Sequence, residues 1–475
     1  MSERPVIAWF DRDLRLADQP MLAAAAACGR PTIPLFILDE AGHGAWPPGA
    51  ASRWWLHHSL AALQRGLADL GLPLVLRRGP AEAVLRDLLA ETGAAAVHWC
   101  RRYEPALRAR DRRIGSALAA SGVEARSFDG GLLCEPEEAR TAGGRPFRVF
   151  GPYWRAVLAR GAPPQPEPAA RPAPPAAVPG GDHLDAWGLR PTRPDWAGGL
   201  REAWRPGEAG ARERLRRFLD EDLRGYRRLR DRPDRQATSR LSPHLHFGEL
   251  SARTIWHAVA TRTAADATLA GDAEAFLREL GWREFSYQLL VAHDRLPEEP
   301  LRAEFTHFPW RRAAGELRAW QHGLTGYPIV DAGMRQLWRT GWMHNRVRMI
   351  VASFLVKDLL VPWQEGEAWF WDTLVDADLA SNAASWQWVA GCGADAAPYF
   401  RVFNPVLQGA KFDPDGGYVR RFVPELARLP AAHIHRPWAA PPAILAAAGL
   451  RLGTDYPAPI VDHAAARRRA LEAFG

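Results

Sequence analysis

Tryptophan is concentrated in one stretch of this chain, together with side chains that hold polar ligands. Nine of the 21 tryptophans fall between Trp310 and Trp388. An indole ring can stack on another flat ring, and it can also carry a one-electron hole. Asn345, Arg348 and Asp376 lie in the same stretch. We therefore expect a large planar cofactor held by polar groups inside a helical domain.

Helical spacing groups some of these residues. Trp338, Trp342, Asn345 and Met349 follow the spacing i, i+4, i+7 and i+11, which predicts that they line one face of a helix. A buried asparagine on an aromatic face needs hydrogen-bond partners, and a heteroaromatic ligand would supply them. His344 is off that face, and we interpret it as a satisfied or surface histidine.

A second helical segment, FLRELGWREF (276–285), carries three different functional groups on roughly one face. Glu279, Trp282 and Arg283 could together read a flat base, stack on it and hold a phosphate. An exposed ion-pair network beside a core tryptophan explains the same residues equally well.

The segment TSRLSPHLHFGELS (238–251) contains a helix-start signal. Ser242 and Pro243 are expected at the N-cap and N1 positions. Free N–H groups at a helix start suit a phosphate, although taken alone a capped helix is the simpler interpretation.

Two carboxylates, Asp376 and Asp378, precede Asn382 and Trp386. No histidine or third acidic residue adjoins them, so we expect no metal site. Hydrogen bonds to a ribityl hydroxyl or to a ring N–H fit better, and an acid-rich helix N-terminus is the alternative.

Residues 1–130 alternate apolar runs with helical patterns, which predicts a doubly wound parallel α/β sheet. The expected strands are 6–10, 32–38, 73–78 and 95–100, and the expected helices lie near 18–28, 51–71, 80–92 and 105–121. No GxGxxG follows the first strand. Any ligand of this domain is expected at the carboxyl ends of the strands.

The rest of the chain is expected to be a connector followed by helices. Residues 161–180 carry eight prolines and should run extended over the surface. We assign 131–207 to a long linker that includes this segment, and 208–475 to a larger all-α domain.

The composition is that of a globular protein, with 47% hydrophobic and 24% charged residues. No apolar run is long enough to span a membrane, and the N-terminus has no signal-peptide pattern. Four scattered cysteines favour a reduced, cytoplasmic location. The net charge of +7 permits DNA binding, but arginine enrichment in a GC-rich genome explains the charge as well.

Taken together, these segments resemble the photolyase/cryptochrome flavoprotein family over nearly the whole chain. The resemblance is carried by WFDRDLRLAD (9–18), SRWWLHHSL (52–60), GYPIVDAGMRQLW, GWMHNRVRM, DADLASNAASWQW, FDPDGGYVRRFVPEL (412–426) and YPAPIVDH (456–463). The stretch GWMHNRVRMIVASFLVKDLL is most similar to class III cyclobutane pyrimidine dimer photolyases. The resemblance implies an α/β domain, an all-α FAD-binding domain and deoxyribodipyrimidine photo-lyase activity.

The implied cofactor is reduced FAD, deprotonated in its active form. The residues that match FAD-binding positions are Tyr226, Thr238, Ser239, Arg240, Leu241, Ser242, Asn345, Arg348, Asp376, Ala377, Asp378 and Asn382. Asn382 matches the residue facing flavin N5. Trp386, Trp363 and Trp310 match a chain that carries electrons from the surface to the flavin.

The implied substrate is a pyrimidine dimer flipped out of DNA. The residues that match its pocket and the flanking phosphates are Arg230, Glu279, Trp282, Arg283, Asn345, Arg346, Met349 and Trp388. In the implied reaction the excited flavin donates one electron to the dimer, the cyclobutane ring opens and the electron returns. Glu279 and Asn345 would stabilise developing charge by hydrogen bonding.

The resemblance also implies an antenna chromophore. Ala106 and Leu107 stand where folate-binding class I relatives have an Asn-Glu pair. Class III relatives hold methenyltetrahydrofolate differently, so this folate is our first expectation. A deazaflavin, or no antenna, is the alternative.

Two rival functions lie within the family. Plant cryptochromes, which signal, carry aspartate where this chain has Asn382, and they add a long C-terminal tail. Photolyases of (6-4) photoproducts use a histidine pair where this chain has His344-Asn345. A plain nucleotide-binding enzyme would not explain the tryptophans. We therefore expect a monomeric repair enzyme whose partner is DNA containing pyrimidine dimers, with no membrane contact.

Overall fold

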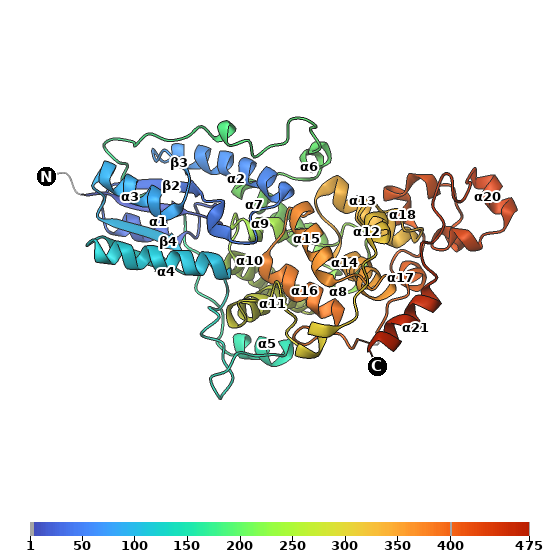
Figure 1. Ribbon diagram of the computed structural model, residues 1–475. Coiled ribbons are helices and arrows are strands. Elements are labelled where there is room, and N and C mark those ends of the chain that lie inside the picture. Colours follow the sequence, from blue (N-terminus) through green and yellow to red (C-terminus); the bar gives the residue numbers. More distant parts are fainter. Residues whose placement is uncertain (1–3, 400, 475) are drawn as a thin grey trace. The chain divides into compact units, whose positions relative to one another are not determined.

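The computed structural model describes residues 4–399 and 401–474 (Figure 1). These residues fall into two compact units. Within the described residues, the first unit runs to Arg224 and also contains Ser239–Asp294. The second unit contains Gly225–Thr238 and the residues from Arg295 onward.

A five-stranded parallel sheet lies in the first unit, in the order β3-β2-β1-β4-β5. Its strands are β1 Val6–Phe10, β2 Thr32–Leu38, β3 Val75–Arg78, β4 Ala96–Cys100 and β5 Glu124–Phe128. The connecting helices are α1 Pro20–Ala27, α2 Ala50–Ala68, α3 Ala81–Thr92 and α4 Pro105–Ala120. The predicted doubly wound parallel sheet is confirmed.

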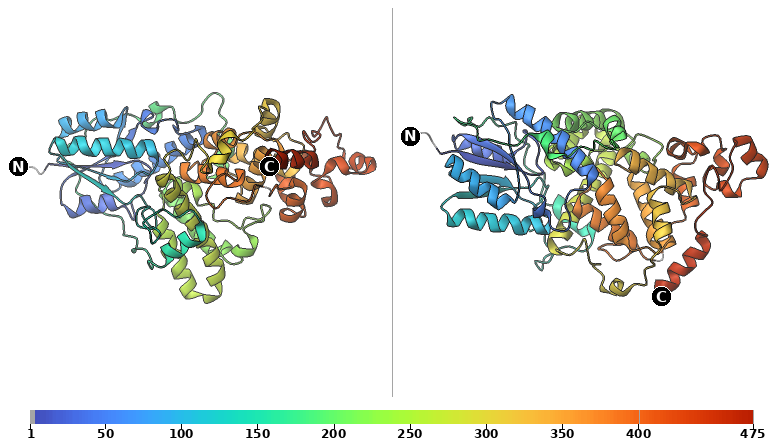
Figure 2. Two further views of the ribbon diagram at one scale, coloured as in Figure 1. Left: turned by 60° about the horizontal axis from the view of Figure 1, so that its bottom comes forward. Right: turned by 45° about the horizontal axis from the view of Figure 1, so that its top comes forward.

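Helices cover both faces of this sheet (Figure 2). Leu85 of α3 and Ile114 of α4 pack on the face that carries Ile7 and Trp9. Ala25 of α1 packs on the opposite face, against Val6. Neighbouring residues of a strand point to opposite faces, so burial on both sides explains why these strands read as continuous apolar runs.

The fifth strand, β5, was not among the predicted strands. Its sequence, EARSF, is mostly polar, and its residues are exposed or only partly buried. It lies at the edge of the sheet, next to β4. An edge strand that is not covered on both faces needs no apolar run, so the pattern used to find the other four strands did not apply.

Outside the sheet, the described residues form helices joined by loops. The remaining helices of the first unit are α5 Phe150–Leu158, α6 Gly198–Ala203, α7 Glu208–Arg217, α9 Ser242–His246, α10 Ala252–Ala265 and α11 Ala270–Ala292. Those of the second unit are α8 Tyr226–Leu229, α12 Ala314–Gln321, α13 Pro328–Thr340, α14 Asn345–Ser353, α15 Trp363–Thr373, α16 Leu379–Ala390, α17 Pro405–Phe412, α18 Gly417–Phe422, α19 Ala431–Ile434, α20 Pro442–Ala448 and α21 His463–Phe474. The predicted helical character of the C-terminal part is confirmed.

The proline-rich segment 161–180 forms neither helix nor strand, apart from an isolated bridge between Ala173 and Pro31. Its backbone also pairs with the first unit: Glu167 N–H donates to the Asp18 carboxylate at 3.1 Å. The segment therefore runs along the α/β part of the chain.

Candidate functional site

The N-terminus of α16 brings together the acidic residues that the sequence singled out. Asp378 is the N-cap residue, and its carboxylate accepts a hydrogen bond from the Ser381 N–H at 2.8 Å. Asp376 accepts two hydrogen bonds from Arg348 of α14, at 2.8 and 3.0 Å. Ala377 is buried between the two acids. The arginine and both carboxylates that were expected around one flavin thus lie in one place.

Asn382 lies one turn further along α16 and is buried. Its amide nitrogen donates to the backbone carbonyl of Glu367 on α15 at 3.0 Å. Since the nitrogen is engaged in this way, the amide oxygen remains as an acceptor for a ligand donor. Burial raises the pKa of the neighbouring Glu367 carboxyl well above its usual range. A guanidinium, carboxylates and an amide oxygen form a donor and acceptor set that suits the ring N–H and hydroxyl groups of a flavin.

The three tryptophans of the expected electron path differ in burial. Trp363 of α15 and Trp386 of α16 are buried, and these two helices pack against each other. The contact is close, because a Cβ at Gly366 would lie 2.1 Å from the Trp386 ring. Trp310 is partly exposed, and its ring centroid lies 4.4 Å from that of Phe308. An electron path to the surface requires burial to decrease in this way. The electron-transfer roles of the three tryptophans stay a prediction.

The continuous helical face expected for Trp338, Trp342, Asn345 and Met349 is wrong. The first helix, α13, ends at Thr340, and Gly341 follows in the left-handed conformation with φ of 65°. A new helix, α14, begins only at Asn345. Glycine adopts this conformation without steric cost, so the chain turns where the apolar spacing seemed to continue.

This break separates the residues of the expected face. Trp338 is 63% exposed, and its ring stacks on Trp369 with centroids 5.9 Å apart. Trp338 is therefore a surface residue rather than part of a helix face turned to the cofactor. Asn345 is exposed at the start of α14 rather than buried on an aromatic face.

His344 is neither a surface residue nor fully satisfied, because its buried Nε2 has no hydrogen-bond partner among the described residues. It is buried, and its Nδ1 accepts a hydrogen bond from the Arg346 N–H at 3.2 Å, which caps α14. Burial lowers the pKa of His344 to about 4, so the ring is neutral at physiological pH and can act as this acceptor.

Residues expected near DNA in the second unit lie around α14. Arg346 forms an ion pair with Asp231 at 2.8 Å, and its guanidinium lies 4.5 Å from the centre of the Phe412 ring. Met349 adjoins the same arginine, with its sulfur 3.6 Å from Nη1. The fold thus fixes Arg346 with an acidic partner that sequence motifs did not indicate.

Three further predicted residues of the second unit lie on other elements. The guanidinium of Arg230 is 5.7 Å from the centre of the ring of buried Tyr226. Trp388 is partly exposed near the end of α16.

The predicted phosphate-binding residues divide between the two units, with Thr238 in the second and Ser239, Arg240, Leu241 and Ser242 in the first. The helix-start assignment is shifted by one residue. The N-cap is Leu241, and Ser242 is already the first residue of α9. Arg240 has a positive φ of 52°, and its guanidinium lies 4.3 Å from the centre of the Trp204 ring.

The expected lesion-side residues of the first unit lie on α11 and are partly exposed. Arg283 binds the buried carboxylate of Glu284 at 2.8 Å, and its guanidinium lies 4.9 Å from the Tyr287 ring centre. Trp282 stacks on Phe150 of α5. Glu279 lies one turn before Arg283. These contacts hold the indole and the guanidinium in defined positions.

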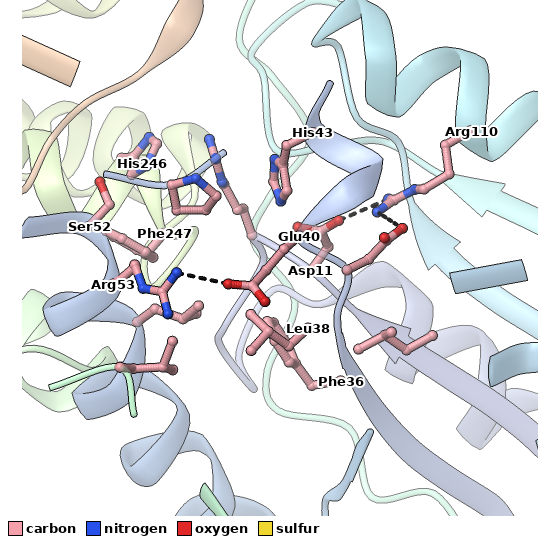
Figure 3. Close-up of a pocket in the computed structure, with 16 residues that line it drawn as sticks. Asp11, Phe36, Leu38, Glu40, His43, Ser52, Arg53, Arg110, His246 and Phe247 are labelled. Carbon is pink, nitrogen blue, oxygen red and sulfur yellow. Dashed lines mark hydrogen bonds and ion pairs between the residues drawn. The ribbon is translucent and has the colours of Figure 1, made fainter. Parts of the chain in front are cut away.

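A pocket opens in the first unit at the carboxyl ends of β1 and β2, the edge of the sheet at which any ligand of this domain is expected (Figure 3). The space between its lining atoms, with the open solvent at its mouth included, is about 600 Å³. Phe36 and Leu38 contribute apolar wall, while Arg53 of α2 contributes a charged group opposite Glu40. The alternation of strands and helices in the sequence predicts a site at this edge but does not indicate which residues line it.

The charged groups of this pocket are paired with one another. Arg53 binds Glu40 at 2.8 Å, and Arg110 binds Asp11 at 3.0 Å. Burial opposes ionisation of Asp11, but the positive charges of Arg102 and Arg110 outweigh it and hold the pKa of Asp11 below its usual value. The pocket therefore combines apolar surface with a few charged groups that are paired within the protein, a composition typical of small-molecule sites.

Two absences concern only the part of the chain that the structure describes. There, no cluster of three or more histidine, cysteine or acidic side chains is arranged to hold a metal ion. No helix among the same residues is long and apolar enough to cross a bilayer.

Two family models match the chain. The model described as "DNA photolyase" matches residues 6–172, and the "FAD binding domain of DNA photolyase" matches residues 276–475. The chain belongs to the DNA photolyase/cryptochrome family, which confirms the resemblance inferred from its motifs.

Individual relatives agree with this assignment. A deoxyribodipyrimidine photo-lyase of Agrobacterium fabrum is 52% identical, with 100% of this chain and 98% of the relative covered. The crystal structure of a bacterial class III photolyase from Agrobacterium tumefaciens has a TM-score of 0.96 and 51% identity, covering 100% and 98% of the two chains. Cryptochrome-1 of Arabidopsis thaliana is 42% identical, covering 98% of this chain and 70% of the relative.

Proposed function

We propose that this protein is a deoxyribodipyrimidine photo-lyase that repairs cyclobutane pyrimidine dimers in DNA in the light. The observation that carries the proposal is the site on α14–α16, where Arg348 pairs with Asp376 and the buried Asn382 amide is held by Glu367. This site lies beside the buried Trp386 in a chain whose 52% identical relative is named as such an enzyme.

The polar groups at α14–α16 would hold FAD. Bound reduced FAD supplies, after absorbing blue light, the electron that opens the cyclobutane ring. Arg348, Asp376 and Asp378 would bind the ring system and ribityl chain, and Asn382 would offer its amide oxygen near N5. Tyr226 belongs to the same proposed cofactor site, as does the set Thr238, Ser239, Arg240, Leu241, Ser242, Asn345 and Ala377.

The remaining residues would act on the DNA. Trp282, Met349 and Trp388 provide flat or flexible apolar surface against which extruded bases can pack. Glu279 and Asn345 would hydrogen-bond to the dimer and stabilise charge that develops on it. Arg283 would line the pocket of the flipped dimer, and Arg230 and Arg346 would contact phosphates beside the lesion.

Trp386, Trp363 and Trp310 would return the flavin to its reduced state. The order of burial, from two interior rings to one partly exposed ring, supports an electron path that begins at the surface.

We further propose that the pocket of the first unit binds the antenna chromophore. Its apolar walls and paired charges support binding of a flat ring system, and methenyltetrahydrofolate is our first choice. A deazaflavin or an empty pocket is the alternative. Release of chromophores from the purified protein, followed by mass spectrometry, decides among them.

The proposed organisation is an antenna-binding domain at 1–130, a connecting region at 131–207 and an FAD- and DNA-binding domain at 208–475. We also propose a monomer that acts in the cytoplasm. The absence of disulfides among the described cysteines supports a reducing compartment.

The decisive experiment is repair of defined lesions by purified, flavin-reduced protein under blue light. Oligonucleotides with one cyclobutane dimer should be restored, whereas those with one (6-4) photoproduct should not. Intact cyclobutane dimers after illumination would refute the proposal. The 42% identity to a plant cryptochrome makes photoreception the second candidate function. Dimers that stay intact after illumination would favour photoreception.

A further inference from the structure

The Trp282 side chain has little freedom of orientation, because a ring from α5 lies flat against it. The centroids of Phe150 and Trp282 are 3.8 Å apart, and their planes differ by 8°. Phe150 is buried at 1% exposure, whereas Trp282 is partly exposed. The protein thus covers one face of the indole, so a base can stack only on what remains exposed.

Close packing of α5 against α11 maintains this stack. A Cβ at Gly281 would lie 2.6 Å from the Trp154 ring, so only glycine allows α11 to approach this closely. Phe285 meets both Phe150 and Trp282 edge-on, with centroids 5.9 and 6.0 Å away. Rotation of either stacked ring would break these contacts.

A second residue of α11 also contacts Phe150. The guanidinium of Arg278 lies 4.9 Å from the centre of the Phe150 ring. Arg278 is one turn before Trp282, so the helix contacts Phe150 through two successive turns. Phe150 is therefore fixed by the helix that carries the lesion-side residues.

We propose that Phe150 is a positioning residue for lesion binding: it holds the Trp282 ring in the plane on which an extruded pyrimidine dimer stacks. This inference rests on the proposed function and deepens it. Aromatic stacking adds to the stability of the paired rings, and a ring that is already oriented loses less conformational freedom when the ligand binds. Phe150 is buried and acts through Trp282.

A double-mutant cycle on full-length, FAD-loaded protein tests the inference. Phe150→Leu, Trp282→Leu and the double variant are compared with the wild type. The measurements are the dissociation constant for an oligonucleotide carrying one thymine cyclobutane dimer, and the single-turnover repair rate at saturation. Phe150→Leu should weaken dimer binding roughly 3- to 10-fold. The repair rate at saturation and the affinity for undamaged DNA should stay at the wild-type level.

Because Phe150 acts through Trp282, the double variant should bind the dimer no more weakly than Trp282→Leu alone. Additive losses, or wild-type binding by Phe150→Leu, would overturn the inference. Phe150→Tyr keeps a ring in the stack and should restore binding.

The matched control is Tyr153→Leu, on the same helix. Tyr153 is buried, and its ring contacts Phe147 and Phe285 instead. The Tyr153→Leu variant should bind the dimer-containing oligonucleotide with wild-type affinity. Equal losses in Tyr153→Leu and Phe150→Leu would show that only the packing of α5 matters, and would also overturn the inference. Failure of the wild type to prefer dimer-containing DNA would instead refute the proposed function.

Discussion

Burial decides the charge state of single residues next to the proposed lesion site. Glu284 is buried on α11, where it binds Arg283 and accepts a hydrogen bond from the Leu133 N–H at 2.7 Å. Burial nevertheless outweighs these contacts and raises the pKa of Glu284 from an ordinary value near 4.5 to about 7. The carboxyl is therefore part protonated near neutral pH, and its hold on Arg283 strengthens as the pH rises.

The raised pKa of Glu284 has a consequence for stability. Folding favours the protonated form, so the wild type should lose stability as pH rises from about 4.5 through 7, by roughly 3 kcal/mol in total. The Glu284→Gln variant has no ionisable group at this position, so it should not show this loss of stability. Denaturant unfolding of both proteins at pH 5 and pH 8 measures the difference. Glu82→Gln, at an exposed site on α3, is the control, and an unchanged gap between wild type and Glu284→Gln at the two pH values would contradict the prediction.

The proposed electron path can be tested at one residue. Trp386→Phe should slow photoreduction of oxidised FAD, because phenylalanine is much harder to oxidise than tryptophan. Repair by protein reduced beforehand should remain at the wild-type level. Trp320→Phe is the matched control, since Trp320 is also buried and its ring centroid lies 6.2 Å from that of Trp386. Equal photoreduction rates in wild type and Trp386→Phe would remove Trp386 from the path.

At the scale of elements, glycines set how closely helices approach and where they end. Gly281 allows α11 to meet Trp154 of α5, and Gly341 ends α13 so that α14 can start in a new direction. Neither role depends on a side chain. Both decide where Trp282 and Asn345 lie.

The contact between α5 and α11 predicts the effect of a single methyl group. Gly281→Ala should destabilise the protein by about 1–3 kcal/mol, because the added Cβ would overlap the Trp154 ring. Denaturant unfolding measures this loss. In α12, Gly315 has no atom within 4 Å of the same added carbon, so Gly315→Ala should be neutral or stabilise by up to about 1 kcal/mol. Equal effects at the two sites would show that the tight contact carries no cost.

At the scale of the whole molecule, the two proposed chromophore sites share no residue. The pocket beside Glu40 and Arg53 lies entirely in the first unit, and Arg348 and Asn382 of the proposed FAD site lie in the second. Side chains that line the pocket can therefore be changed without replacing a residue that is proposed to hold FAD.

This separation predicts independent loss of the two chromophores. The double variant Glu40→Ala/Arg53→Ala removes an ion pair from the pocket and should reduce the content of the antenna chromophore several-fold. FAD content, and repair driven by light that FAD absorbs directly, should remain at the wild-type level. Absorption spectra and repair action spectra check both parts. A parallel loss of FAD would contradict the independence of the sites.

Much of the fold was predictable from the sequence, because the spacing of apolar residues along the chain indicates which of them are buried. The apolar runs at Val6–Phe10 and Thr32–Leu38 matched β1 and β2, whereas the polar edge strand β5 was missed. Residue spacing alone predicted one helix face that continues past Gly341. In the structure the left-handed conformation of Gly341 ends the helix and changes the direction of the chain. Periodicity records which residues are apolar, but it does not record a turn made by a single backbone angle.

For the candidate site, residue types and motifs by themselves determined the family, the flavin and the tryptophan-rich region. Tertiary structure alone decided that Arg346 pairs with Asp231, that Asn382 is held by Glu367, and that Phe150 covers one face of Trp282. The physical reason is distance along the chain. Helical and strand periods relate residues a few positions apart, whereas these contacts join segments that only packing of the whole unit brings together.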